Sequence, residues 1–462
     1  MNIQEKLKEV LIVGAGPAGL AAANVLARKA NVTLIEQGNS VEKRTCPSPK
    51  KCIKCGNCPM SNGVGGAGCF SDGKFVYETI LGNRQVGSNL SEVIGSEEEI
   101  KYIIRAKLFF QYYFGHDIEY PSKEKLSQAQ EISRRAAVND MNYIFSCQNH
   151  IGTDKLPAVI KRIQDELTSK GVNIVTNERV ETISGNCVRT NKNFYQTDAV
   201  ILAPGRKGAD WLESILKQND VPIDYRAVDI GFRIETDAKI IENLANIARD
   251  IKLSFRLPWN GDLIRTFCAC PNGVVTRETY EKGFNLVNGA SDSQKASENS
   301  NFSLLMSIPL THRVNCNTYA DHIAMTFHDA GADKPVVQRY GDLKSKRRSQ
   351  ETKSPEWRIQ PTLRDVLYGD VGIAMPYRIV IGLMEGIERL SAPGLMPGLN
   401  QASTLLYAPE MKRNGLKIKT DEYLQTPKKG LYIAGDGPGC SRGIVGAAAS
   451  GILAADGILR DN

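Results

Sequence analysis

The sequence has almost no long hydrophobic run. Only Ile444–Leu459 approaches the length of a membrane span, and its many Gly and Ala residues, together with Asp456, indicate a buried helix. The N-terminus is charged and its apolar run breaks at Gly14, which is not the pattern of a signal peptide. We therefore expect a cytoplasmic protein that has no membrane span.

Neither sign of charge dominates the chain. Its 58 basic and 51 acidic residues leave a net charge of +7, too diffuse to indicate a nucleic-acid partner, and the densest basic run, Lys344–Arg348, is typical of a solvated loop. Eleven cysteines are an odd number and they cluster, which favours thiol, metal or redox chemistry over a disulfide framework. A length of 462 residues predicts one very large domain or two to three smaller ones.

The strongest pattern lies near the N-terminus. A short apolar strand is followed by a helical pattern and by a second apolar strand that ends at Glu36. A G-x-G-x-x-G motif joins the first strand to the helix: Gly14, Gly16 and Gly19, with Pro17 and Ala18 inside it. The three glycines allow a tight turn, the approach of a pyrophosphate, and close packing of the helix, whose N-terminus offers N–H groups to phosphates. Glu36 is placed to accept hydrogen bonds from an adenosine ribose, which favours FAD or NAD over NADP.

The end of the chain decides between FAD and NAD. Leu431–Ala434 predicts a strand, Gly435 and Asp436 end it, and a helix begins at Ile444 directly after Gly443. This arrangement resembles the second FAD signature of glutathione-reductase-like flavoproteins. The resemblance implies that Asp436 binds the ribityl chain or the pyrophosphate side, and that the helix N-terminus points at the flavin N1–C2=O edge. A helix dipole there would stabilise the negative charge of reduced flavin, so we predict FAD.

A cysteine run and a glycine loop follow Glu36. Arg44 comes first, as a partner for a phosphate or for the adenine side, and the loop contains Gly65, Gly66 and Gly68, whose backbone can wrap around a pyrophosphate and a flavin. Between them lie Cys46, Cys52, Cys55 and Cys58, in the spacing C-x5-C-x2-C-x2-C. Three interpretations stay open: an iron–sulfur or zinc site, a catalytic redox pair at Cys52 and Cys55, or reduced thiols without shared chemistry.

The following region predicts a helical insertion. Ile100, Ile103, Ile104 and Leu108 recur at helical spacing after a capping box that begins at Ser96. Farther on, His150 is one of only five histidines and is a candidate proton donor or flavin neighbour, with a packed histidine that shapes a turn as the alternative.

Beyond Asp224 the pattern changes to period-two stretches, which predict an antiparallel sheet. The segment Gly283–Asn301 is rich in Ser, Asn and Gly and predicts a loop. Cys268 and Cys270 alternate along an expected strand, so we interpret them as buried apolar thiols on one face.

A wider resemblance runs from about Val10 to Ile458. It is carried by seven strings in this order: GVGGAGCFSDGKF, HIGTDKL, ILAPGRKG, VDIGFRIE, FCACPNGVV, VVQRYGD and GDGPGCSRGIVGAAASGI. In this order they resemble a widespread family of uncharacterised FAD-dependent dehydrogenases within the glutathione-reductase-like flavoproteins. The resemblance implies that a residue near Val180 holds the adenine by its backbone and that the chain passes the cofactor again at Gly205. It implies a cofactor and a fold, and it names no substrate.

We therefore predict an α/β protein with a discontinuous Rossmann-like FAD-binding domain. Its segments are 1–80, 141–224 and 394–462, with a helical insertion at 81–140 and a mixed α+β substrate domain at 225–393. The predicted function is an FAD-dependent oxidoreductase that moves a hydride or two electrons between an unknown donor and an organic substrate. Apart from the glycine loop at Gly63–Gly68, no second G-x-G-x-x-G is present, so the donor is NAD(P)H bound transiently or a redox partner protein. The alternatives are a flavin-dependent C=C bond reductase, an RNA-modifying flavoprotein and a cysteine-based redox sensor.

Overall fold

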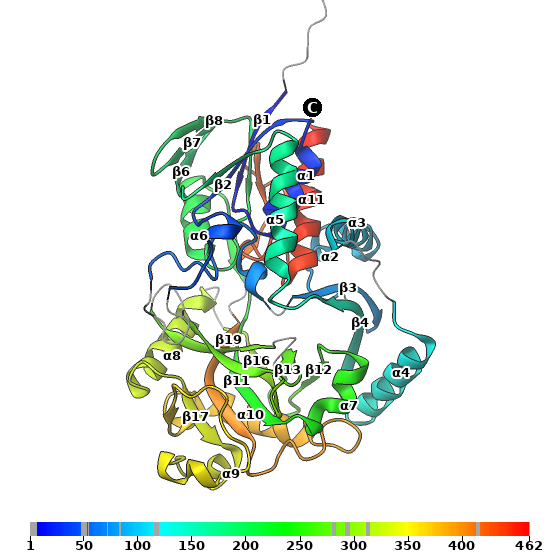
Figure 1. Ribbon diagram of the computed structural model, residues 1–462, viewed down its shortest axis with the longest axis vertical. Helices are drawn as coiled ribbons and strands as arrows, with labels where there is room; N and C mark the ends of the chain where they lie inside the picture. The colour runs from blue at the N-terminus through cyan, green and yellow to red at the C-terminus, as the bar shows by residue number, and fades with distance from the viewer. Residues whose placement is uncertain are drawn as a thin grey trace, which may run out of the picture.

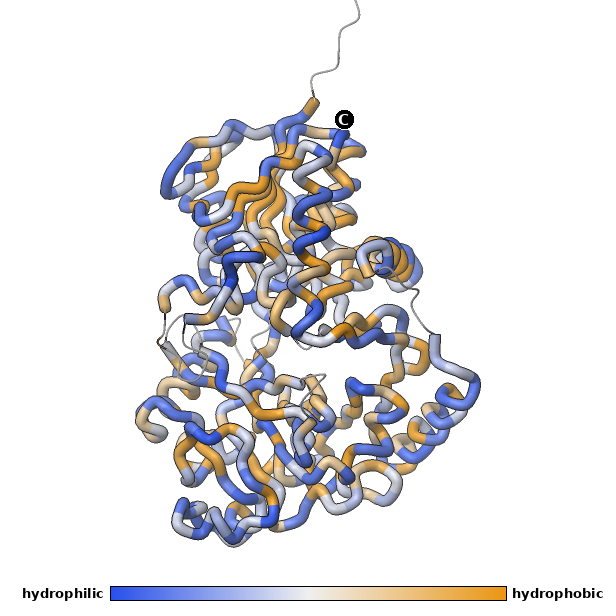
Figure 2. The backbone as a smooth tube through the Cα atoms, in the orientation of Figure 1, coloured by the Kyte–Doolittle hydropathy of each residue, from blue (hydrophilic) through white to orange (hydrophobic). Residues whose placement is uncertain are grey.

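The computed structural model describes residues 7–47, 53, 55–71, 73–82, 85–114, 120–279, 283–291, 296–310, 315–412 and 416–461. They form two halves, upper and lower in Figure 1, and each half is built around its own sheet. Each sheet has its own hydrophobic core, and the strands of the upper one form an orange band in Figure 2. The protein is a mixed α/β structure, as predicted.

The upper half contains a five-stranded parallel sheet. Its strand order is β21 (Leu431–Ile433), β9 (Ala199–Leu202), β1 (Glu9–Val13), β2 (Asn31–Glu36) and β5 (Asn173–Thr176). These strands are short apolar runs, which is typical of parallel strands covered on both faces. The first and the last segments of the chain therefore meet in one sheet, as the discontinuous domain requires.

Helices α1 (Pro17–Leu26) and α11 (Ile444–Arg460) pack against each other beside this sheet, and α5 (Leu156–Ser169) lies next to α1 (Figure 1). A Cβ at Gly451 would overlap the carbonyl oxygen of Ala18, so the glycine allows the two helices to approach closely. Almost every residue of α11 is buried, which confirms that Ile444–Leu459 is a core helix. Among the described residues, no helix is both long enough and apolar enough to cross a bilayer.

Smaller elements complete the upper half. An antiparallel sheet contains β6 (Val180–Ser184), β7 (Cys187–Thr190) and β8 (Phe194–Gln196), and helix α6 (Ala209–Gln218) follows β9. Strands β10 (Ile223–Tyr225) and β20 (Leu416–Ile418) form a separate pair. Two 3-10 helices are η1 (Val41–Lys43) and η2 (Ala67–Phe70).

The lower half contains a nine-stranded sheet that is antiparallel except for one pair at its edge, β17 with β18. The strand order is β18 (Leu367–Tyr368), β17 (Val336–Arg339), β19 (Leu405–Lys412), β11 (Val228–Asp237), β16 (Asn299–Ile308), β13 (Leu263–Cys270), β12 (Lys252–Arg256), β4 (Asn142–His150) and β3 (Lys74–Leu81). Strands β3, β4 and β19 come from the segments 1–80, 141–224 and 394–462, which we predicted from the sequence to form the FAD-binding domain.

Helices and short 3-10 turns surround this sheet. They are α7 (Lys239–Ile247), α8 (Cys316–Ala330), α9 (Tyr340–Lys344), α10 (Tyr377–Leu390), η3 (Glu351–Glu356) and η4 (Val371–Ile373). Apolar residues of α10 pack on the sheet, where Gly386 lies against Ile264 and Leu304.

The loop predicted at Gly283–Asn301 is wrong for most of its described residues. Strand β15 (Asn285–Ala290) pairs with β14 (Val274–Thr279) as a hairpin, and β16 begins at Asn299. Its polar residues serve pairing here: the Asn288 amide donates to Glu278 across the hairpin. Composition alone therefore misjudged strands whose polar side chains bond to their neighbours.

The region 81–140 is helical among its described residues, with α2 (Ser91–Ile94), α3 (Ser96–Phe114) and α4 (Lys123–Val138). Of the four predicted apolar positions on α3, only Ile103 is buried, whereas Ile100, Ile104 and Leu108 are exposed. The buried face is instead formed by aromatic and small residues: Tyr102, Ala106, Phe109, Phe110 and Tyr113. Because α3 packs against α11, that partner decides which face is covered.

Candidate functional site

The turn between β1 and α1 places its three glycines in three different environments. A Cβ at Gly14 would overlap the carbonyl oxygen of Ala203, and Gly14 also has a φ of 102°, which disfavours other residues. A Cβ at Gly19 would overlap the carbonyl oxygen of Gly14. At Gly16 a Cβ would meet nothing within 4 Å. Packing within the protein therefore explains Gly14 and Gly19, whereas Gly16 borders open space at the N-terminus of α1.

Glu36 joins three loops at the end of β2. Its carboxylate accepts hydrogen bonds from the backbone N–H groups of Ala15 at 3.0 Å, Gly38 at 2.9 Å and Gly63 at 2.9 Å. The side chain is only 6% exposed. A carboxylate offers about four acceptor positions, so three are already used by the protein and about one is left for a ribose hydroxyl. The sequence missed this structural role, because the donors are backbone groups with no residue signature.

Arg44 organises the loop from Pro59 to Val64, which directly follows Cys58, the last cysteine of the run. Its guanidinium donates to four backbone carbonyls, those of Pro59, Met60, Gly63 and Val64, and lies 4.8 Å from the centroid of the Phe70 ring. Burial lowers the pKa of Arg44, although nearby Cys69 and Glu36 oppose that effect. Most of its donors are therefore committed to the loop itself, and a contact with phosphate or adenine stays a prediction.

The glycine loop meets both helix N-termini. A Cβ at Gly66 would lie 3.1 Å from the Cα of Gly16, and one at Gly68 would lie 3.5 Å from side-chain atoms of both Ile444 and Pro17. Gly65 has a φ of 93°, which allows the chain to turn here. The loop, the start of α1 and the start of α11 thus come together at the carboxyl edge of the parallel sheet, as the sequence predicted from separate motifs.

The loop after β21 completes this edge. Asp436 accepts a hydrogen bond from the Ser441 hydroxyl at 2.5 Å, and its other oxygen lies 3.4 Å from Nε of Arg206. Around Gly443, directly before α11, a Cβ would make only ordinary contact, the nearest atom being the Cα of Gly87 at 3.7 Å. At Gly205, which has a φ of 68°, a Cβ would meet nothing within 4 Å. Gly205 is therefore a second point of this edge, after Gly16, with open space beside the backbone.

These features fit an elongated dinucleotide cofactor. A helix N-terminus carries a partial positive charge and leaves its first N–H groups without partners inside the helix. Helices α1 and α11 each begin directly after a glycine, and Gly16 has open space beside it. The remaining predicted contact, Val180, is buried at the start of β6 in the adjoining sheet. A methyl group added at Gly16 would meet no atom of the protein within 4 Å, so the space there can hold atoms of a ligand.

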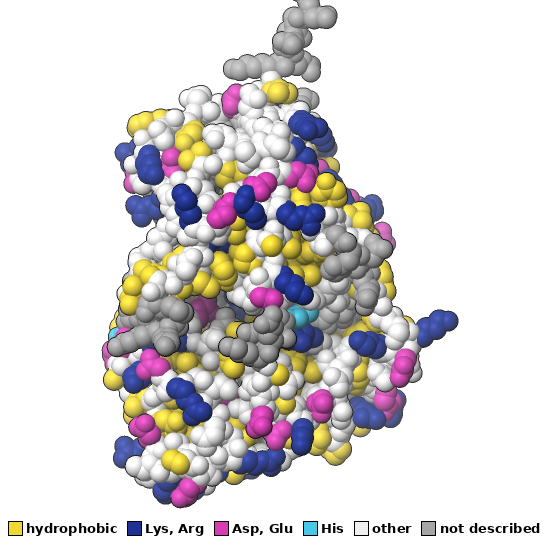
Figure 3. All heavy atoms as spheres, viewed as in Figure 1, with side chains coloured by type: hydrophobic (Ala, Val, Ile, Leu, Met, Phe, Trp, Pro, Cys, Tyr) yellow, Lys and Arg dark blue, Asp and Glu magenta, His cyan; other side chains and the backbone are white. Residues whose placement is uncertain are grey.

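A basic cluster lies on the large sheet and faces this edge. We define it as Lys252, Arg265 and Lys412, whose side chains surround the Phe267 ring, together with Arg206 and Arg442 from the cofactor edge. The Lys412 ammonium lies 3.5 Å from the ring centroid, Lys252 4.6 Å and Arg265 5.4 Å. Arg265 pairs with buried Asp229, and Lys252 pairs with Asp250 at 2.6 Å. Figure 3 shows a recess at mid-height, between the two halves of the molecule.

Lys412 is the exception within the basic cluster. Its side chain is 4% exposed, and its ammonium nitrogen has no hydrogen-bond partner among the described residues. Burial holds the pKa of Lys412 well below its usual range, and the neighbouring charges of Arg265, Arg206, Arg442 and Lys252 add to the effect. Sequence reasoning missed this residue, because its surroundings come from four separate segments of the chain.

Cys268 and Cys270 are not the apolar thiols that the sequence predicted. The Arg233 guanidinium, which is fully buried, donates to the carbonyl oxygen of Cys268 at 2.9 Å and to the sulfur of Cys270 at 3.3 Å. Lys74 donates to the carbonyl oxygen between them, that of Ala269. The strand alternation was local, whereas the charged neighbours come from β11 and β3, which only the fold places here.

The other predicted catalytic and metal residues are only partly described. Cys52 lies outside the described residues. Cys46, Cys55 and Cys58 are partly buried, and the pKa of Cys58 is lowered: burial opposes this shift, but hydrogen bonds involving Ser61 and Met60 outweigh it. Among the described residues no group of three or more His, Cys, Asp or Glu side chains could hold a metal ion. His150 ends β4, where it pairs in register with Lys74.

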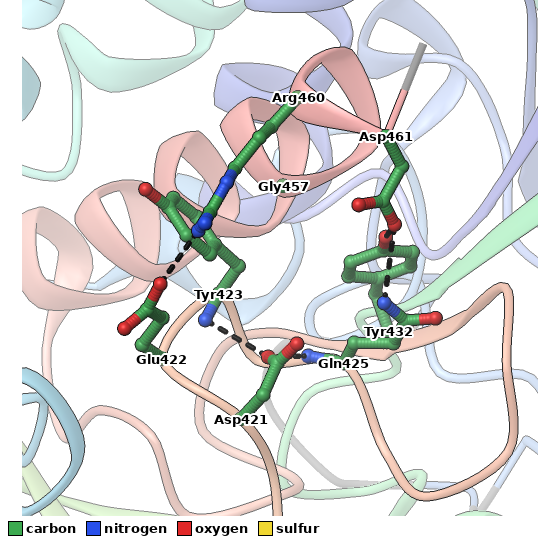
Figure 4. Close-up of a pocket in the computed structure, with 8 residues that line it drawn as sticks. All are labelled: Asp421, Glu422, Tyr423, Gln425, Tyr432, Gly457, Arg460 and Asp461. Carbon is green, nitrogen blue, oxygen red and sulfur yellow. Dashed lines mark hydrogen bonds and ion pairs between the residues drawn. The ribbon is translucent and has the colours of Figure 1, made fainter.

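A surface pocket of about 350 Å³ lies elsewhere, at the C-terminal end of α11 (Figure 4). Its polar side chains satisfy one another: Arg460 pairs with Glu422, and the Tyr432 hydroxyl donates to Asp461. The helix has 17 residues, so this pocket is about 25 Å from the helix N-terminus at the cofactor edge. It is separate from the candidate site.

Comparisons with known proteins agree with this geometry. Residues 8–102 match the family described as pyridine nucleotide-disulphide oxidoreductase, and residues 227–413 match the family described as FAD-dependent protein, C-terminal domain-like. An uncharacterised protein of Clostridium beijerinckii is 27% identical over 482 residues, which cover 97% of this chain and 80% of that protein.

Among solved structures, the chain matches glycine oxidase from Geobacillus kaustophilus, with 12% identity, a TM-score of 0.38 and coverage of 98% of this chain and 95% of that one. Another is L-amino acid deaminase from Proteus myxofaciens in complex with anthranilate, with 14% identity, a TM-score of 0.39 and coverage of 100% and 92%. Likenesses at this level carry no argument about activity. The two family matches, together with the cofactor edge, show an FAD-dependent oxidoreductase.

Proposed function

We propose that this FAD-dependent oxidoreductase is a glutathione-reductase-like flavoprotein that binds FAD along the carboxyl edge of the parallel sheet. The observation that carries the proposal is the open space at Gly16, at the N-terminus of α1, together with the open space at Gly205 on the same edge. Gly16, Pro17, Ala18 and Gly19 would approach the pyrophosphate, and Glu36 would accept from the adenosine ribose. Gly65, Gly66 and Gly68 would line the cofactor from the opposite loop.

The flavin end would lie against the start of α11. Bound FAD supplies two-electron transfer between a donor and a substrate. The N-terminus of α11, at Gly443 and Ile444, would stabilise negative charge at its own end of the site. Asp436 is held by Ser441 and Arg206, so its carboxylate has a defined position for a hydroxyl or an N–H donor. Gly435 directly precedes Asp436, and the carbonyl oxygen of Gly205 lies beside Gly437, so both glycines bring backbone to this region.

The basic cluster supports a substrate that carries an anionic group. Lys412 is buried without a hydrogen-bond partner among the described residues, in a place where four neighbouring cations repel its charge. A carboxylate or phosphate bound between Lys412 and Arg265 would offset that repulsion and raise the pKa of Lys412. The substrate class we propose is therefore an anionic organic molecule, oxidised or reduced on the face of the large sheet. The transient donor NAD(P)H is one such anion.

A pair of glycine variants tests the cofactor site. Gly16→Ala adds a methyl group into open space, so the protein should fold normally and lose most of its FAD. Gly14→Ala is the matched control within the same motif, and it should destabilise the fold itself through overlap with Ala203. Far-UV circular dichroism, thermal unfolding and the flavin absorbance of purified protein distinguish the two. Full flavin content in Gly16→Ala would contradict the proposal.

The donor and the substrate class need separate measurements. The absorbance spectrum, recorded anaerobically before and after NADH or NADPH is added, shows whether a nicotinamide reduces the flavin. For the anion, thermal unfolding of the wild type and Lys412→Met is compared in the presence of small dicarboxylates and inorganic phosphate. We expect stabilisation in the wild type that is lost in Lys412→Met and retained in Lys192→Met, a variant at an exposed lysine in the β7–β8 turn. Equal stabilisation in all three would exclude this site.

A further inference from the structure

A second cavity, of about 300 Å³, lies beside the turn that follows β21. Its walls come from helix α2, strand β20, the chain that follows β20, and the turn itself, at Pro438–Cys440. It shares Asp421 and Glu422 with the pocket in Figure 4, and the other residues that line the two cavities differ. The volume is at the lower end of the range for small-molecule sites, about 300–1,000 Å³, so the cavity suits a small ligand.

Most of the cavity wall is apolar. The side chains that form it include Leu90, Val93, Ile418, Leu424 and Ile433. All of these except Val93 are buried in the protein, and Val93 is 39% exposed. Val93 therefore marks a side on which the cavity meets solvent. An apolar wall next to an exposed apolar side chain suits a ligand whose apolar body covers both.

The acidic side chains at the cavity already have partners. The Glu92 carboxylate accepts hydrogen bonds from two nitrogens of Arg226, at 2.8 and 3.0 Å. The Asp421 carboxylate accepts from two backbone N–H groups of its own turn, at 2.9 and 2.8 Å. Glu422 accepts from Arg460 at 2.6 Å. Each of these acceptors is thus committed within the protein.

The basic side chains at the cavity are less fully used. Lys417 lies 3.6 Å from Glu92, which is too long for a hydrogen bond. Lys419 is exposed and has no partner in the part of the chain that the structure describes. Nε of Arg226 is buried, and no described group accepts a hydrogen bond from it. The groups left for a ligand are therefore donors on cationic side chains, and their charge is complementary to a carboxylate.

The turn at Pro438–Cys440 connects this cavity to the cofactor edge. Asn89, which lines the cavity, donates from its side chain to the carbonyl oxygen of Gly439 at 2.8 Å and from its backbone N–H to that of Cys440 at 3.0 Å. Within the turn, the Gly439 N–H donates to the carbonyl oxygen of Asp436 at 3.1 Å. Gly439 has a φ of 81°, and a Cβ there would overlap a backbone carbonyl of β20. A ligand that fixes this tightly packed turn therefore also restrains Asp436.

We propose that this cavity binds a small monocarboxylic acid with an apolar body, and that its binding strengthens the binding of FAD. The carboxylate pairs with Lys417 and Lys419, and the body lies against the apolar wall. Because the ligand keeps Asp436 in place for the cofactor, each of the two ligands favours the other by the same factor. Occupation of the cavity stands on its own geometry, whereas the link to FAD rests on the function proposed above.

Thermal unfolding of the full chain tests the binding step. The parent protein is Lys412→Met, so that a carboxylate bound at the basic cluster contributes little. Hexanoate and phenylacetate should each raise the unfolding midpoint more than their neutral amides do. The difference should vanish in Lys417→Gln/Lys419→Gln and in Val93→Trp, whose indole fills the exposed side of the cavity. It should remain in Lys429→Gln, a control at an exposed lysine outside the cavity.

No difference in the parent, or one that persists in either cavity variant, overturns the proposal. The link to FAD is measured by fluorescence titration of flavin-free protein. With hexanoate present, FAD should bind about fivefold more tightly, and Val93→Trp should show no such gain. Equal FAD affinity with and without hexanoate contradicts the link. Protein that binds no FAD at all, yet shows the unfolding difference, would refute the function proposed above and support the carboxylate site.

Discussion

The ammonium nitrogen of Lys412 lies 3.5 Å from the centroid of the Phe267 ring, on a sheet face that also carries Lys252 and Arg265. The face of an aromatic ring attracts a cation, but three cations around one ring also repel each other. Because Lys412 is buried, its charged form is disfavoured when no anion is present, and burial lowers its pKa well below the ordinary value. This relationship leads to a stability prediction that needs neither substrate nor flavin.

Lys412→Met should stabilise the ligand-free protein near neutral pH. The pKa of Lys412 is lowered in the folded state, so between that pKa and the ordinary value of about 10.4 the unfolded chain binds one more proton than the folded chain. Wild-type stability therefore rises with pH through this window, by at most about 1.4 kcal/mol per pH unit. Urea unfolding at several pH values should show an advantage of Lys412→Met that shrinks as pH rises. A constant difference would mean that Lys412 is charged in the folded protein.

Glu410 should produce the opposite pH dependence. Its folded pKa of about 8 lies above the unfolded value of about 4.3, so between these values the folded state binds the extra proton and stability falls as pH rises. Glu410→Gln lacks this titration and should gain relative stability from about pH 5 to about pH 8. Glu124→Gln, at an exposed site on α4, is the control and should follow the wild type. Parallel curves for Glu410→Gln and the wild type would place the carboxyl in its ionised form.

Glu36 is predicted to matter for the fold as well as for FAD. Glu36→Ala leaves the N–H groups of Ala15, Gly38 and Gly63 without their acceptor, and each buried unpaired group costs about 1–3 kcal/mol. The midpoint of urea unfolding of flavin-free protein should therefore fall. Glu36→Gln keeps the oxygen that serves Gly38 and Gly63, and should retain most of the stability. If Glu36→Ala unfolds like the wild type, these three bonds contribute little and only a role toward the ribose remains.

Asp436 should affect FAD more than folding. Asp436→Ala removes an acceptor from the cofactor edge and breaks the bond from Ser441, so FAD should bind more weakly by the value of one charge-assisted bond, about 1.5–3 kcal/mol. Ser441→Ala is the comparison, because it breaks the same bond and keeps the carboxylate. Fluorescence titration of flavin-free protein with FAD gives both affinities. Equal losses in the two variants would show that Asp436 only supports its loop.

Much of the cofactor edge could be predicted from the sequence. Gly14, Gly16 and Gly19 lie within six residues of one another and Asp436 lies eight residues before Ile444, so local geometry dictates their roles. The alternation of short apolar strands and helical patterns likewise predicted the parallel sheet and the core helix α11, since both depend on periodicity within one segment.

Neighbours that lie far apart in the chain decided the surroundings of several side chains, which the sequence could not predict. Cys268 and Cys270 look like apolar core thiols until β11 brings Arg233 and β3 brings Lys74 beside them. The same limit applies to Arg44, whose charge suggested a phosphate partner but whose donors bind carbonyl groups of its own loop.

The sequence by itself determined the cofactor class, because the motifs that predict it depend on residues a few positions apart; the two ends of the cofactor's site stay predictions. Only the tertiary structure decided the electrostatics of the opposite face. Lys412, Arg265, Arg206 and Arg442 come from segments far apart in the chain, and their pKa values depend on burial and on distances between them. Such quantities are properties of the packed sheet edge, where the low dielectric strengthens every charge–charge interaction, and no spacing along the chain encodes them.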